Sequence, residues 1–76
     1  MAQIIQGKVL TAVPIIDVSD ANNIYIGDAK IGSSEDAAVW QILKINKSGS
    51  IYHFYYADGD LRYNNVWSNR GSLNYS

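Results

Sequence analysis

The chain has 76 residues, enough for one small domain, and it contains no cysteine and a single histidine, which excludes disulfides and thiolate metal sites. Charged residues make up only 17% of it and the formal net charge is -1, so it lacks the basic clusters that bind nucleic acid. Hydrophobic residues account for 47%. Because a domain this small buries only about 60% of its unfolded surface, we expect it to gain stability by association, as a homo-oligomer or with a partner.

The first 18 residues mix β-branched and polar side chains and include the only proline, Pro14. We predict one strand or two short strands over 3–10 and 12–18, with Pro14 at an edge or bend because proline cannot donate to a sheet ladder. Residues 1–18 are thus an extended arm or an edge strand. The segment lacks the features of a signal peptide, and no run is long and apolar enough to span a membrane. Short polar residues at 19–23 indicate a turn.

Residues 23–31 alternate apolar and polar side chains, as a strand with one exposed face does, and Gly27 within them predicts a bulge or kink. The next segment, residues 32–38, is predicted to be a loop with room for one helical turn. Ser34 is the candidate cap for that turn. The segment is too short for a free-standing helix.

Two strands at 39–45 and 51–57, joined by a glycine-containing connection at 46–50, predict a central hairpin over about residues 39–57. Both faces of each strand are largely apolar, whereas a strand with one face in water alternates more cleanly. We therefore expect this hairpin to be covered on both sides. One cover comes from the rest of the chain and the other from a neighbouring subunit or partner.

The remainder of the chain begins with a tight turn at Asp58-Gly59-Asp60. A short strand or a helical turn is predicted near residues 64–69, and a last strand at 72–75. The whole chain, residues 1–76, is predicted to be a single all-β domain, a small antiparallel sandwich or barrel.

Few residues are candidates for catalysis or for metal or phosphate binding. Asp58 and Asp60 flank a glycine as calcium ligands do, but Arg62 follows where a further oxygen ligand is needed and no glutamate closes the loop. His53 lies within a strand without a recognisable nucleophile arrangement, and the carboxylates fall mostly in turns. No glycine falls in the strand–loop–helix context of a phosphate-binding loop. We predict that the protein is not an enzyme and binds no cofactor or metal ion.

Tyrosine and tryptophan dominate the aromatic residues, and both types are enriched at protein interfaces. We predict interface contacts by Trp40, Tyr55, Trp67 and Arg70. Exposed aromatic rings flanked by asparagine also stack on sugar rings, so a carbohydrate-binding module is the main alternative. Trp67 is the residue that tests it.

The stretches that carry a recognisable pattern are Tyr25-Ile26-Gly27, Gly32-Ser33-Ser34, Ala38-Val39-Trp40-Gln41-Ile42, Tyr56-Ala57-Asp58-Gly59-Asp60, Asn64-Asn65-Val66-Trp67-Ser68-Asn69-Arg70, Ser72-Leu73 and Tyr75. Together they resemble small proteins encoded among the structural genes of tailed bacteriophages. The chain departs from that group at Asn64, Ser68 and Asn69, where acidic residues are common, and at Gly71, where alanine is common.

This resemblance implies a virion protein, made in the host cytoplasm, that contacts itself or other virion proteins. Capsid decoration, a connector, and a tail or fibre component are the roles it implies, and it supplies no catalytic residues. We therefore predict a non-catalytic structural or assembly protein. The alternatives are a carbohydrate-binding module displayed for host attachment and a small phage-encoded binder of a host protein.

Overall fold

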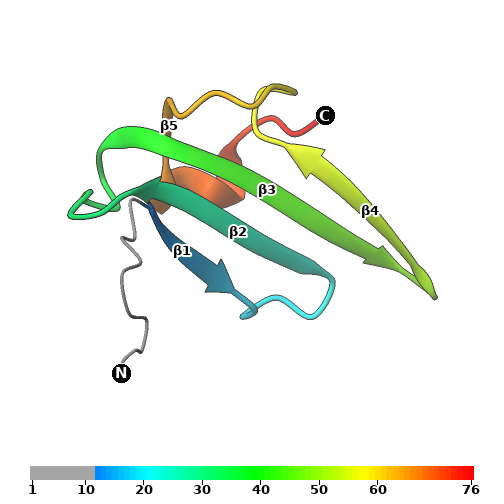
Figure 1. The fold of residues 1–76 in the computed structure, drawn as a ribbon. Helices are drawn as coiled ribbons and strands as arrows, with labels where there is room; N and C mark the ends of the chain where they lie inside the picture. Colours follow the sequence, from blue (N-terminus) through cyan, green and yellow to red (C-terminus); the bar gives the residue numbers. More distant parts are fainter. Residues whose placement is uncertain (1–11) are drawn as a thin grey trace, which may run out of the picture.

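The computed structural model describes residues 12–76, which form an antiparallel sheet with a short 3₁₀ helix against one face (Figure 1). The strands β1 to β4 neighbour one another in chain order, and β5 pairs with the first part of β3. No helix in this part of the chain is long and apolar enough to cross a membrane. The elements are β1 (Ala12–Asp17), β2 (Asn23–Lys30), β3 (Ala38–Ser48), β4 (Ile51–Tyr56), β5 (Asn65–Val66) and the helix η1 (Trp67–Ser72).

The predicted all-β class is confirmed, and β1 is an edge strand that carries Pro14. The strand predicted over residues 3–10 lies outside the described residues. At the turn before β2, the Asp20 carboxylate accepts the N–H of Asn22 at 2.8 Å. The loop before β3 contains turns but no helical turn, and within it the Ser34 hydroxyl accepts the N–H of Asp36 at 3.1 Å.

β3 and β4 form the predicted central hairpin, but the connection is shorter than predicted. Pairing continues to Ser48 and Ile51, so only Gly49 and Ser50 remain in the turn. Gly49 has a φ of 63°, which suits the first position of a two-residue hairpin turn. The longer strands extend the apolar surface of the hairpin toward its tip.

The bulge predicted at Gly27 is wrong, because β2 pairs with β1 and β3 without interruption through this residue. Glycine is required there for another reason. A Cβ atom at position 27 would lie 2.6 Å from Cε3 of Trp67 and 3.1 Å from Cγ2 of Ile15. The missing side chain lets the indole ring rest directly on the sheet.

The turn at Asp58 and Gly59 is confirmed, since both residues have positive φ, 58° and 68°. Beyond it the chain forms both of the alternatives predicted for residues 64–69, first β5 and then η1. The predicted last strand is reduced to one isolated bridge between Ala57 and Tyr75, because η1 continues to Ser72.

The core lies between the sheet and η1 and is formed by few side chains. The rings of Trp40 and Trp67 lie 5.9 Å apart at a tilt of 42°. The indole N–H of Trp40 donates to the Ser34 carbonyl at 2.9 Å, and buried Asn65 donates to the Trp40 carbonyl at 3.1 Å. This face of the sheet is therefore closed by the chain itself, around a cluster of Ala29, Trp40, Ile42, Ala57 and Trp67.

Candidate functional site

The four predicted interface residues lie in different settings. Trp40 and Trp67 are 3% and 2% exposed and belong to the core. Arg70 lies over the Trp67 ring, with its Cζ 4.6 Å from the ring centroid. Tyr55, on β4, is half-buried and stacks against His53. The two indoles are thus engaged by their own chain, and the surface open to a partner consists mainly of other side chains.

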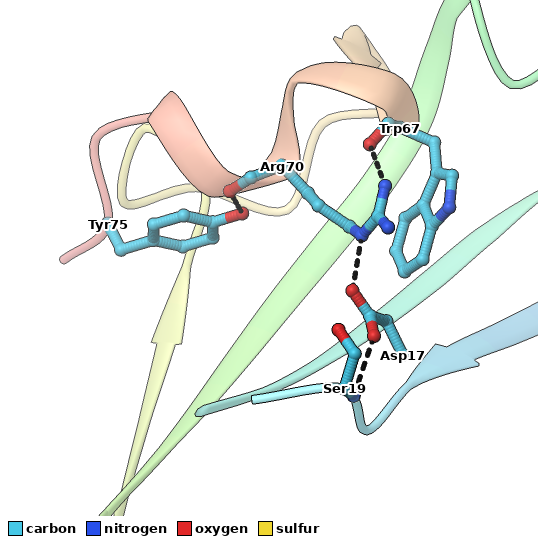
Figure 2. A network of polar contacts seen from close by, with 5 residues as sticks. All are labelled: Asp17, Ser19, Trp67, Arg70 and Tyr75. Carbon is cyan, nitrogen blue, oxygen red and sulfur yellow. Dashed lines mark hydrogen bonds and ion pairs between the residues drawn. The ribbon is translucent and has the colours of Figure 1, made fainter. Parts of the chain in front are cut away.

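Arg70 ties η1 to the end of β1 (Figure 2). Its Nε donates to Oδ2 of Asp17 at 2.8 Å and its Nη1 to the Trp67 carbonyl at 3.1 Å. The carbonyl of Arg70 accepts the Tyr75 hydroxyl at 2.7 Å. Burial, and then the neighbouring Tyr25, raises the pKa of Tyr75, so its hydroxyl stays protonated as a donor. This network fastens the helix and the tail to the sheet.

Acid is expected to weaken the attachment of η1 and the tail to the sheet. Hydrogen bonds from Ser19, first its hydroxyl and then its N–H, and next from Arg70, lower the pKa of Asp17 from 3.8 to about 2. A carboxylate whose pKa is depressed by folding stabilises the folded state above its unfolded pKa, and this contribution is lost as pH falls toward about 2. As the pH falls from 3.8 to about 2, we expect the urea midpoint to fall more steeply in the unmodified chain than in Asp17→Asn.

The control for the pH series is Asp28→Asn, because Asp28 lies outside the network of Figure 2. Its acid dependence is expected to follow that of the unmodified chain. Equal slopes for Asp17→Asn and the unmodified chain would show that the Asp17 contacts contribute nothing to folding.

The face of the sheet away from η1 is open: across residues 12–76 no helix or strand lies over it (Figure 1). Side chains alternate along each strand, and residues directly opposite each other on antiparallel strands share a face. The register therefore collects a continuous surface across β1 to β4, which we call the open patch: Ile16, Ile24, Ile26, Leu43, Ile45, Tyr52, Phe54 and Tyr56.

The open patch contains no charged side chain, and its borders are polar. Ile16 is 61% exposed and Phe54 62% exposed. Asp28 lies beyond one end of the patch, and at the other end Lys47 lies on the same face, directly opposite Tyr52. An apolar surface with polar residues around it is typical of a protein contact site. The pattern of two apolar faces on the hairpin was the sequence signal for it.

A second feature lies on the face that carries η1, beside the helix and tail. It is a shallow hollow of about 420 Å³ lined by Lys44, Asn46, Tyr55 and Tyr75. The Lys44 ammonium lies 5.0 Å from the centre of the Tyr75 ring. The side-chain amide of Asn46 donates to Asn23 at 2.8 Å. The hollow thus combines aromatic rings with amide and ammonium groups.

In residues 12–76 no three His, Asp or Glu side chains gather closely enough to hold a metal ion. Comparison of the chain with protein-family models, curated proteins and solved structures found no match.

Proposed function

We propose that this chain is a non-catalytic assembly protein that acts through contacts made by the open patch with copies of itself. The observation that carries the proposal is an uncharged apolar surface across four strands, with no described element above it. Identical patches without charge can meet without repulsion, and symmetric self-association is the commonest form of oligomer. Burial of the patch would supply the hydrophobic stabilisation that the small core lacks.

The resemblance to bacteriophage structural proteins indicates where such an assembly protein would act, namely in a virion. A virion component is present in many copies, and binding between folded copies stabilises each of them by mass action. Capsid decoration, a connector, or a tail or fibre component are the roles that follow from the resemblance. Detection of the chain in purified phage particles would support the virion role.

Self-association is expected to be visible in the mass of the unmodified chain. A single copy has a mass of 8.4 kDa, and light scattering should report a larger mass that rises with concentration in the micromolar range. Since the open patch is uncharged, added sodium chloride should leave the association intact, unlike a contact made by exposed ion pairs. A mass of one copy at every concentration, or dissociation by salt, would contradict the proposal.

The hollow favours carbohydrate binding as a second candidate function. Tyrosine rings offer flat faces to sugar rings, and the amide of Asn46 and the ammonium of Lys44 offer polar partners at the same place. Trp67 is buried and cannot serve as the sugar platform. A glycan array with the unmodified chain and with Tyr55→Ala separates this candidate from the first.

A further inference from the structure

The outer edge of β4 carries backbone groups that point away from the sheet. The N–H of Ala57 donates to the Ile42 carbonyl at 3.0 Å, so Ala57 faces β3. The N–H of Lys47 instead donates to Asn22 at 2.8 Å, so its partner Tyr52 is not bonded to β3 at that position. Since bonding alternates along an antiparallel strand, Tyr52, Phe54 and Tyr56 direct their N–H and C=O groups outward.

The tail of the chain covers one end of this edge. Tyr56 and Ser76 exchange two backbone hydrogen bonds, each of 3.1 Å. Within residues 12–76 no segment pairs with the outward groups of Tyr52 and Phe54. The free edge therefore runs over 51–55, from the hairpin turn to the level of the tail, and His53 lies at its centre.

This edge has none of the usual protection against pairing. The sequence of β4, IYHFYY, contains no proline, lysine or carboxylate. The other edge strand, β1, carries Pro14 and ends at Asp17. Sheet proteins block unused edges with proline or charge, because free backbone groups recruit another strand. An aromatic, uncharged edge of limited length is suited to a specific partner strand.

We propose that β4 pairs with β4 of a second copy, antiparallel and with a two-fold axis at His53. This inference rests on the proposed function, since it adds to the contact of the open patch a second contact, at the sheet edge, between copies of the chain. Tyr52 then lies opposite Phe54 of the second copy, and the outward backbone groups of both residues are bonded. Centring the pair on Phe54 instead would bring the second copy against the tail at Ser76, and centring it on Tyr52 would use the turn residue Ser50.

The pairing extends the open patch. A two-fold axis perpendicular to the joined sheets keeps the same face of both copies on the same side. Tyr52 and Phe54 lie on the open face, so the seam consists of two cross-strand aromatic pairs, a stabilising combination. The dimer therefore presents one apolar surface that runs over both sheets, and this surface is available to further copies.

The test places a cysteine at the axis. The chain has no cysteine of its own, and His53 is exposed, so His53→Cys introduces one thiol without disturbing the core. In the proposed register the two thiols belong to a non-hydrogen-bonded pair with Cα atoms about 4.5 Å apart, within the range for a disulfide. We expect His53→Cys to form a disulfide-linked dimer under mild oxidation, in a chain that stays folded by circular dichroism.

Ile51→Cys is the matched control, because Ile51 is exposed and lies on the same face of the same strand. In the proposed register its two copies are displaced by about 14 Å along the strands, beyond the reach of a disulfide. We expect cross-linking of His53→Cys to be at least about tenfold faster than that of Ile51→Cys. Equal rates overturn the inference.

Light scattering and cross-linking together distinguish a wrong β4–β4 register from a failure of the proposed self-association. If the unmodified chain is oligomeric by light scattering and His53→Cys does not cross-link, the register is wrong and self-association stands. If the unmodified chain is a single copy and His53→Cys does not cross-link, both are wrong.

Discussion

Trp67→Ala is expected to cost about 3–5 kcal/mol of folding free energy, the range found when a large aromatic side chain is removed from a core. The Trp67 ring is 2% exposed and contacts Trp40, Arg70 and the glycine of β2 at once. A domain of this length is stable by roughly 0.05–0.15 kcal/mol per residue. Over the 76 residues this is about 4–11 kcal/mol, so the loss is a large fraction of the total, and the urea midpoint should fall far below that of the unmodified chain.

Urea denaturation followed by far-UV circular dichroism measures this loss. Tyr63→Ala is the control, because Tyr63 is an aromatic residue that is 54% exposed and lies outside the core and the open patch. Its substitution should change stability by no more than about 0.5 kcal/mol. Similar urea midpoints for the two variants would show that Trp67 is not the centre of the core.

The hairpin and the turns could be predicted from the sequence because their signals are local. Two β-branched and aromatic runs with a glycine between them specify the β3–β4 hairpin, and Asp58 and Gly59 specify their own turn. The roles of the tryptophans could not be predicted in this way. Trp67 is buried because η1 packs on the sheet at Gly27, a contact between segments far apart in the sequence.

Part of the open patch could also be predicted from the sequence. Alternation places Leu43 and Ile45 on one face of β3, and Phe54 and Tyr56 on one face of β4. Deciding which face is open required the position of η1. The contribution of Ile16 required the register of β1 on β2, which pairs it with Ile26. Local patterns could thus identify an apolar excess on the hairpin but not the surface on which it lies.

The small size of the chain explains why a small core and an open sheet face occur together. One face of the sheet is closed by the two indoles and by the network around Arg70. No further described segment is left to close the other face. A chain of this size has enough side chains for one covered face, and we propose that association stabilises the second.

Association through the open patch is most directly tested by sedimentation equilibrium of Ile16→Lys beside Ile31→Lys. Ile16 is 61% exposed within the patch, on the strand farthest from β4, and Ile31 is 53% exposed outside the patch. Both variants should fold, since neither side chain is in the core. A buried, unpaired ammonium in the contact should weaken association of Ile16→Lys by about 2 kcal/mol or more, roughly thirtyfold, while Ile31→Lys associates like the unmodified chain. Equal association of the two variants would contradict the account.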